Sequence, residues 1–314
     1  MPSIPYTVGG FVQGIAIANI FYGISIAQAY VYVQHWEHDP RWMKWLATII
    51  ILLETGNTVF LQRQQFFYSI LSIGDPLLVA KIDWSMPVAL LFEVASEIFV
   101  QTFYVHRMWM FSKNRILTFG TITLLISRHG FFLYCIADTI KLKTWTETEL
   151  SKIFRSFFIS TAALGILTDA IIATTMAYYL YRNQSQLKRT RGVVGWLIIY
   201  FVNTGALLVG FSACTIISYL AAPDSLLFGA FIMFYARAVA NSLFGALNAR
   251  HLLRAKIDKS VALSDFSNIP SRLLHSVPIH TRLETATVPK ISPESSRVTF
   301  SSEAPARVSV QTVP

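Results

Sequence analysis

The chain has 314 residues, of which 54% are hydrophobic and 14% are charged, and its mean hydropathy is +0.49. Soluble domains carry about a quarter charged residues, so this composition excludes a soluble globular protein, a disordered chain, a coiled coil and a disulfide scaffold. The formal net charge is +9, but the basic residues lie at the ends of apolar segments. This placement argues against nucleic acid as a partner and favours contact with membrane lipid.

Apolar residues gather in seven blocks, each long enough to cross the hydrocarbon core as a helix, which takes roughly 20 residues. The alternating pattern of a membrane β-barrel is absent. We therefore predict an all-α fold, a polytopic integral membrane bundle of seven transmembrane helices within residues 1–255. The predicted spans cover residues 8–33, 45–67, 87–111, 116–140, 155–181, 193–220 and 226–248. A short stretch, residues 111–115, separates the third span from the fourth and requires a tight turn.

Residues 256–314 are rich in Ser, Thr and Pro and contain few apolar runs. Such a segment cannot bury enough apolar surface to fold alone, so we predict a disordered cytoplasmic tail. It is either a solvated tail without a role, or a regulatory segment whose charge is changed by phosphorylation near residues 292–297.

Positively charged residues in short loops predict the orientation. With the N-terminus outside, thirteen Lys and Arg residues fall on the cytoplasmic side and six on the outer side. We therefore expect an extracellular N-terminus and a cytoplasmic C-terminus, in the plasma membrane. The first seven residues hold no Lys or Arg, so the first span is expected to stay as an anchor rather than to be removed as a signal peptide.

Charged and amide side chains inside the spans are the most informative residues, because an ionised group in mid-membrane costs at least about 2.5–3.5 kcal/mol. We predict an internal polar layer in which four acids face two arginines and are joined by two amides. Because acids outnumber arginines, we expect at least one carboxyl group that is able to be neutral at pH 7. The residues of this layer are Glu54, Glu93, Glu97, Gln101, Arg128, Asp169, Arg237 and Asn241.

Three interpretations of these residues are open. They form buried ion pairs that fix helix register and do no more. They line a ligand-binding or ion-binding site. Or the helix centres are misplaced, and the side chains reach the interface instead.

The sequence lacks the motifs of several well-known membrane proteins and enzymes. Span seven has no lysine for a retinal Schiff base, and the chain has no phosphate-binding glycine loop, no Gly-x-Ser-x-Gly and no His-Glu-x-x-His. We therefore expect no enzyme, no cofactor and no metal site. Seven spans with almost no internal proline also weaken the prediction of a transporter built from inverted repeats.

The pattern as a whole resembles the uncharacterised seven-span membrane proteins of mushroom-forming (basidiomycete) fungi, a domain-of-unknown-function family. The likeness covers about residues 10–255, and at Glu54 the family more often has Asp. The motifs that carry it are Glu54-Thr55-Gly56-Asn57, Gln101-Thr102-Phe103-Tyr104-Val105-His106-Arg107-Met108-Trp109, Thr168-Asp169 and Leu247-Asn248-Ala249-Arg250. The resemblance implies an integral membrane protein with an extracellular N-terminus and supplies no activity.

Arg107, Asn248 and Arg250 lie at the predicted cytoplasmic ends of spans three and seven. They either stabilise helix C-termini and the orientation, or form a polar latch that differs between two conformations.

Two functions follow from the polar layer. The first is a receptor-like protein that binds a small-molecule ligand, arriving from outside or from lipid, in a midplane polar pocket and acts on a cytoplasmic signalling partner. The second is a proton- or cation-coupled transporter, or a lipid-handling protein. A structural membrane protein is a third reading.

Overall fold

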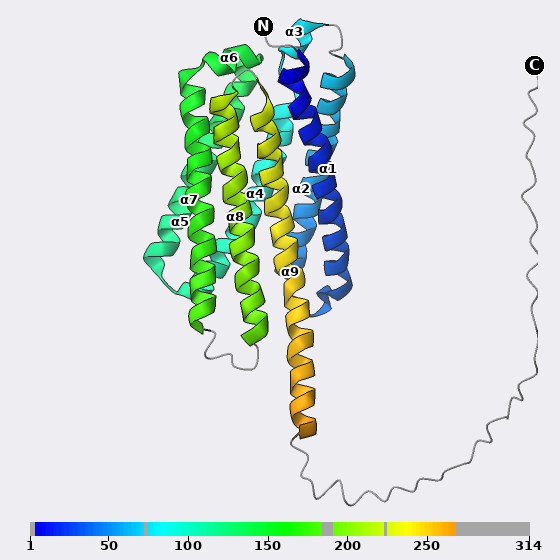
Figure 1. The fold of residues 1–314 in the computed structure, drawn as a ribbon, viewed down its shortest axis with the longest axis vertical. Helices are drawn as coiled ribbons and strands as arrows, with labels where there is room; N and C mark the ends of the chain where they lie inside the picture. The colour runs from blue at the N-terminus through cyan, green and yellow to red at the C-terminus, as the bar shows by residue number, and fades with distance from the viewer. Residues whose placement is uncertain (1–3, 72–74, 184–190, 223–224, 268–314) are drawn as a thin grey trace, which may run out of the picture. The chain divides into compact units, whose positions relative to one another are not determined.

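A computed structural model describes residues 4–71, 75–183, 191–222 and 225–267, and these residues are almost entirely helical (Figure 1). The long helices are α1 (Ile4–His35), α2 (Arg41–Phe66), α4 (Ser85–Ser112), α5 (Arg115–Leu142), α7 (Lys152–Asn183), α8 (Arg191–Ala221) and α9 (Leu227–Ser267). The short elements are the 3-10 turn η1 (Trp36–His38), the π-helical turn η2 (Phe67–Leu71), α3 (Pro76–Val79) and α6 (Trp145–Leu150).

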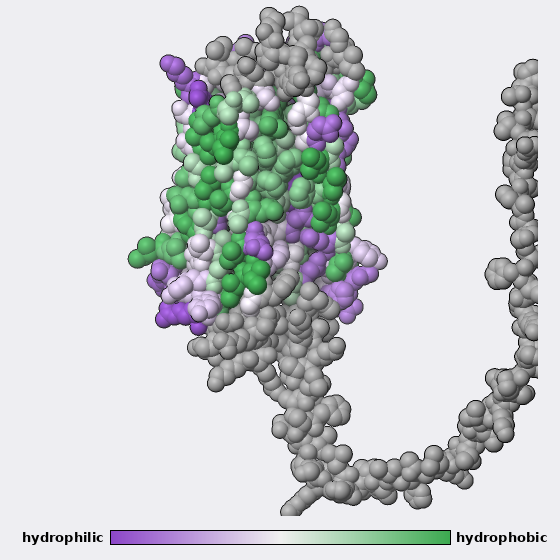
Figure 2. Space-filling model, viewed as in Figure 1, coloured by the Kyte–Doolittle hydropathy of each residue, from purple (hydrophilic) through white to green (hydrophobic). Residues whose placement is uncertain are grey.

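The prediction of seven spans is confirmed, because seven of the described helices are long and apolar enough to cross a membrane. The first covers Val8–His35 and the last Leu227–Ala249, within a few residues of the predicted bounds. A helix satisfies its backbone groups internally, which is what a hydrocarbon environment demands of these apolar segments. Apolar side chains cover much of the middle of the face in Figure 2, while hydrophilic ones gather mostly toward its ends.

The end of the last helix differs from the predicted boundary at residue 255. Helix α9 continues to Ser267, because residues 250–267 contain no glycine or proline that would stop it. The remainder of the predicted disordered tail, residues 268–314, lies outside the described residues.

Helices α9 and α4 form the centre of the bundle. In the apolar 18-residue stretch of each span, 72% of α9 and 56% of α4 are buried inside the bundle, against 28–33% for the other five spans. A small-residue contact brings α1 against α9, since a Cβ atom added at Gly14 would lie 2.4 Å from the Cβ of Ala230. Such a close approach is typical of small residues at membrane helix interfaces.

One end of the bundle is covered by two connections, which we call the cap and define as residues 75–84 and 143–151. The backbone N–H of Ile82 donates to the carbonyl of Lys143 at 2.9 Å, and that of Trp145 donates to Ala80 at 3.0 Å. The hydroxyl of Tyr68 donates to the carbonyl of Lys81 at 3.0 Å. These hydrogen bonds hold the cap over the end of the bundle at which α1, α4, α7 and α9 begin (Figure 1).

The tight turn between the third and fourth spans is confirmed at the opposite end. Helix α4 ends at Ser112 and α5 begins at Arg115. Lys113 takes the left-handed conformation, with φ of 51°, that commonly ends a helix. The side chain of Asn114 then caps α5 by accepting a hydrogen bond from the N–H of Leu117 at 3.3 Å.

Candidate functional site

The predicted polar layer exists, and it falls into two groups on different sides of α9. All four acids and both arginines are buried, and the relative exposure of Arg237 is 1%. Each arginine pairs with one acid, Arg237 with Glu54 and Arg128 with Glu97. The acids and arginines therefore point inward at one another, as the cost of a charge facing lipid requires.

The first group, which we call the Arg237 cluster, joins α9 to α2. One guanidinium nitrogen of Arg237 donates to the carboxylate of Glu54 and also to its backbone carbonyl at 3.2 Å. The other donates to the side-chain oxygens of Asn57 at 2.7 Å and Thr58 at 2.8 Å. A planar guanidinium offers several donors in fixed directions, and here they are divided among three residues within two turns of α2.

Neighbouring groups complete the Arg237 cluster. The hydroxyl of Ser96 donates to the second carboxylate oxygen of Glu54 at 2.8 Å. The side chain of Asn57 donates to the carbonyl of Ala89 at 2.8 Å, so α4 is tied in as well. The ring of Tyr22 on α1 lies 5.4 Å from the guanidinium carbon of Arg237. Asn241, one turn further along α9, donates to the carbonyl of Phe21 at 3.1 Å. The cluster thereby connects four helices.

The second group, which we call the Arg128 cluster, joins α5 to α4, α7 and α9. Arg128 donates to Glu97 at 3.1 Å and to the hydroxyl of Tyr235 at 2.8 Å. That hydroxyl in turn donates to Asp169 at 2.8 Å. Gln101 donates to the same hydroxyl at 3.3 Å, so Tyr235 is the centre of the cluster.

His129 extends this cluster toward the outside of the bundle. Its Nε2 lies 2.9 Å from the side-chain oxygen of Gln101. Because that oxygen can only accept, the imidazole donates from Nε2. The other ring nitrogen of His129 and the Nε of Arg128 are buried, and neither has a hydrogen-bond partner among the described residues. The Arg128 cluster therefore contains two buried nitrogen atoms that make no hydrogen bond with the described residues.

Helix geometry explains why two clusters form instead of one. Tyr235 and Arg237 are two residues apart on α9, which rotates their side chains by about 200° around the helix axis. Arg237 consequently faces α2, and Tyr235 faces α4, α5 and α7. The buried position of α9 lets both faces carry polar groups without contact with lipid.

Glu93 belongs to neither hydrogen-bonded cluster. It is 3% exposed, and one of its carboxylate oxygens is buried without a partner among the described residues. It lies close enough to Glu54, Glu97 and both arginines to interact with them electrostatically. The layer thus holds four acids and two arginines within a small volume.

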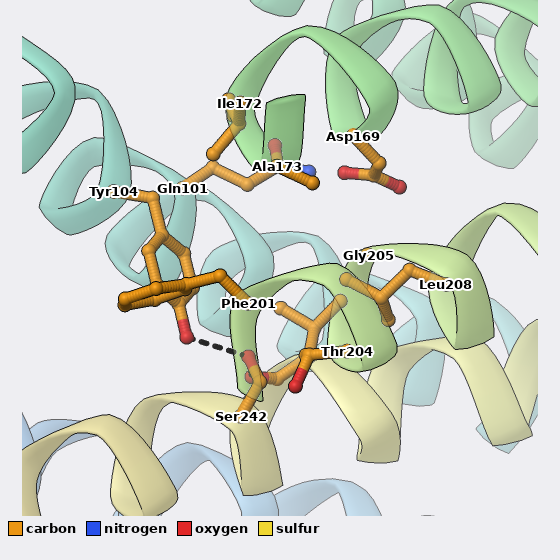
Figure 3. A pocket seen from close by; sticks show the side chains of 11 residues that line it. Gln101, Tyr104, Asp169, Ile172, Ala173, Phe201, Thr204, Gly205, Leu208 and Ser242 are labelled. Carbon is orange, nitrogen blue, oxygen red and sulfur yellow. Dashed lines mark hydrogen bonds between the residues drawn. The ribbon is translucent and has the colours of Figure 1, made fainter. Parts of the chain in front are cut away.

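Two small cavities border the Arg128 cluster. One, of about 30 Å³, is lined by Gln101, Tyr104, Asp169, Thr204 and Ser242 among others (Figure 3). The second, of about 40 Å³, is lined by Glu97, Arg128 and Tyr235 and by residues of α7 and α8. A cavity needs roughly 10–15 Å³ to hold one water molecule, so each has room for a few waters and neither for an organic ligand.

Larger hollows lie on the outer face of α4. A groove of about 700 Å³ runs between α4 and α5, and we call it the α4–α5 groove. Its wall is mostly apolar but includes Gln101 and His129, the outermost members of the Arg128 cluster. A second groove of about 660 Å³ lies between α2 and α4 and is lined by Trp42, Trp45 and residues of α4. We call it the α2–α4 groove.

Two of the three residues of the predicted cytoplasmic latch, Arg107 and Asn248, contact different helices. The guanidinium carbon of Arg107 lies 4.8 Å from the ring centroid of Phe201 on α8. The side chain of Asn248 donates to the carbonyl of Gln28 on α1 at 2.9 Å. The side chain of Arg250 lies outside the described residues, so the latch stays a prediction.

Sequence reasoning missed Tyr235, although it makes more polar contacts than most of the residues that were chosen. Tyrosine is common near span ends, so its presence in an apolar span does not by itself indicate a buried polar contact. Its position two residues before Arg237 was the available signal, because a second polar side chain on a buried helix also needs a partner. Among the described residues, no three His, Cys, Asp or Glu side chains are placed to hold a metal ion.

Comparison with known proteins gives one match. Residues 165–252 match a family described as of unknown function, DUF6534. The matched region begins within α7 and ends within α9, so it contains Asp169, Tyr235, Arg237 and Asn241. No curated protein and no solved structure matches the chain. The match agrees with the resemblance to a family without an assigned activity, while the fungal source stays a prediction.

Proposed function

We propose that this integral membrane protein is receptor-like and binds a small amphipathic ligand that reaches it from the membrane. The observation that carries the proposal is the α4–α5 groove, a hollow of about 700 Å³ whose apolar wall includes Gln101 and His129. Ligand sites are typically 300–1,000 Å³, mostly apolar, with a few placed polar groups. The cavities inside the layer have room for only a few waters each, so we place the ligand's apolar part in the groove and its polar part against Gln101 and His129.

Approach from the membrane is favoured over approach from outside. The cap ties residues 80–82 to residues 143–145 across the end of the bundle. The α4–α5 groove, in contrast, is bordered by side chains such as Ile126, which is 69% exposed. An apolar molecule dissolved in the bilayer therefore meets the groove directly.

The Arg128 cluster supplies a route from the groove to the rest of the bundle. A ligand that competes for Gln101 or His129 changes the hydrogen bonds that reach the Tyr235 hydroxyl. Tyr235 is bonded to both Arg128 and Asp169, so a change there alters how α5 and α7 are held against α9. Ligands act by differential affinity for two such arrangements. The response would be read by a cytoplasmic signalling partner at the opposite end of the bundle.

The proposed orientation places the capped end outside and the plasma membrane as the location. It rests on the excess of Lys and Arg in the connections at the opposite end. Asn183-Gln184-Ser185 is a glycosylation sequon that this orientation puts in the cytoplasm. Expression in a glycosylating cell is expected to leave Asn183 unmodified, and a glycan on that residue would reverse the orientation.

The ligand proposal is tested with the full chain in lipid nanodiscs. Binding of a fluorescent amphiphile is measured for the wild type, for Gln101→Leu and for a matched control, Gln13→Leu, at an exposed position of α1. The proposal expects at least tenfold weaker binding in Gln101→Leu and unchanged binding in the control, since one lost hydrogen bond in a buried site accounts for about that factor. Equal binding in all three proteins would overturn it.

A proton- or cation-coupled transporter is the second candidate, and a specific observation favours it. Glu93 and Asp169 are buried acids without an arginine of their own, and Asp169 borders a cavity large enough for water. Glu97→Gln separates the two functions in proteoliposomes. Loss of proton-coupled flux would support a transporter, whereas altered amphiphile affinity without flux would support a receptor.

A further inference from the structure

The two grooves flank one face of α4 at the same depth. Thr102 and His106 line both of them, so these exposed side chains form the ridge that separates the α2–α4 groove from the α4–α5 groove. The remaining α4 residues of the two walls fall between Ile98 and Trp109, about three helical turns. Two mostly apolar hollows of nearly equal volume therefore lie on either side of this ridge.

Positive charge lies where the two grooves approach the opposite end of the bundle. Lys113 and Arg115 form the turn that joins α4 to α5, and both are exposed. Neither forms an ion pair with another described residue. The sequence between Glu97 and Asp138 contains no acidic residue, so the parts of α4 and α5 next to the turn carry no negative charge that offsets it.

The α2 side of the same end adds aromatic rings and further basic residues. Trp42 and Trp45 line the α2–α4 groove and Trp109 lines the α4–α5 groove. Tryptophan prefers the depth of lipid headgroups, which places that depth at this end of the grooves. Arg41 and Lys44 start α2 beside them, although Glu37 and Asp39 offset their charge. Of the basic residues at the ends of these two grooves, Lys113 and Arg115 are therefore the pair without an acidic residue close by in the sequence.

We propose that this face binds one two-chain anionic phospholipid astride α4. One acyl chain occupies each groove, and the acidic headgroup lies against Lys113 and Arg115. The inference goes beyond the proposed function, because the polar part of this lipid meets Lys113 and Arg115, while an acyl chain lies beside Gln101 and His129 in the α4–α5 groove. The two neighbouring apolar hollows offer space for two acyl chains, and Lys113 and Arg115 offer positive charge for an anionic headgroup. A neutral lipid would leave that charge without a counterpart, and a single-chain amphiphile would leave one hollow empty.

The headgroup is tested with the full chain in detergent. Binding of phosphatidylglycerol and of phosphatidylcholine with identical chains is compared by native mass spectrometry. The proposal expects at least tenfold tighter binding of phosphatidylglycerol, since each basic residue near a membrane surface attracts anionic lipid. Lys113→Asn/Arg115→Gln is expected to remove that preference. Lys141→Gln/Arg155→Gln makes the same change of charge at exposed residues of the capped end and is expected to keep it.

The grooves are tested with a second pair of variants on α5. Gly130 lines the α4–α5 groove, and a Cβ atom added there meets nothing within 4 Å, so Gly130→Leu adds a side chain to the groove wall at a position with open space. Gly120 is equally open but is not part of that wall, which makes Gly120→Leu the matched control. We expect at least tenfold weaker phosphatidylglycerol binding in Gly130→Leu and unchanged binding in Gly120→Leu.

Failure of this inference and failure of the proposed function give different results. Equal binding of the two phospholipids, equal binding of lysophosphatidylglycerol, or an unaffected Gly130→Leu would each overturn the phospholipid site. A neutral amphiphile that still depends on Gln101 would then leave the receptor proposal standing. Conversely, phosphatidylglycerol binding could change as expected in the four variants and stay the same in Gln101→Leu and Glu97→Gln. That result would support the phospholipid site and remove its link to the Arg128 cluster.

Discussion

The Arg237 cluster and the Arg128 cluster use the same chemistry, an arginine and a glutamate buried between helices, yet they are built differently. Around Arg237, short bonds to Glu54, Asn57 and Thr58 leave little space. Around Arg128, one guanidinium nitrogen has no partner among the described residues, and two water-sized cavities adjoin the cluster.

The difference separates a structural role from an adaptable one. Both terminal guanidinium nitrogens of Arg237 are bonded to side chains of α2, although the Oδ1 of Asn241 has no partner among the described residues. A densely bonded buried network rigidifies the fold, whereas an unpaired buried group is costly and gains from a new partner. The Arg128 cluster is also the one that reaches a groove on the surface, through Gln101 and His129. We infer that the Arg237 cluster holds the bundle together and the Arg128 cluster is the part that responds.

The largest effect is expected for Arg237→Met. Removing this guanidinium leaves the Glu54 carboxylate buried without its cation and also deprives Asn57 and Thr58 of a donor. Breaking a buried pair in this way costs about 3–5 kcal/mol. Unfolding by sodium dodecyl sulfate in bicelles measures the loss, and a cost below about 1 kcal/mol would contradict the structural role.

Arg128→Met is expected to destabilise the bundle less, by about 2–3 kcal/mol. The same type of pair is broken with Glu97, but the adjoining cavity of about 40 Å³ allows water to hydrate the remaining carboxylate. The same unfolding experiment compares the two variants directly. A loss equal to or larger than that of Arg237→Met would remove the distinction between the clusters.

Tyr235→Phe tests the centre of the Arg128 cluster at constant shape. The hydroxyl bonds to Arg128, Asp169 and Gln101, and hydrogen bonds between membrane helices are worth about 0.6 kcal/mol on average and about 1.7 at most. We expect a loss of about 1–2 kcal/mol. Tyr30→Phe, at a position 65% exposed, is the matched control and should leave the unfolding midpoint unchanged.

Glu93→Gln should have the smallest effect, at or below the roughly 0.6 kcal/mol of an average hydrogen bond between membrane helices, because Glu93 belongs to neither hydrogen-bonded cluster. Glu93 has no ion pair to lose among the described residues, and glutamine has nearly the same shape. Thermal unfolding in the same bicelles provides the comparison. A loss of several kcal/mol would show that Glu93 carries an interaction on which the layer depends.

The sequence by itself determined the seven spans, the tight turn after Ser112 and the identity of the buried acids and arginines. These follow from local properties: the length of an apolar run and the cost of a charge in hydrocarbon depend little on which helix lies beside which. The same local reasoning missed the continuation of α9 to Ser267, where the absence of glycine and proline outweighed a polar composition.

Tertiary structure alone decided how the layer is divided. The pairing of Glu54 with Arg237 and of Glu97 with Arg128, and the central position of Tyr235, depend on which faces of α2, α4, α5 and α7 turn toward α9. The same is true of the place of Glu93 outside both hydrogen-bonded clusters. The same holds for the grooves beside α4, because their volume is set by the distance between helix axes. Helix rotation and spacing arise from packing among all seven spans, and no single segment of the sequence encodes them.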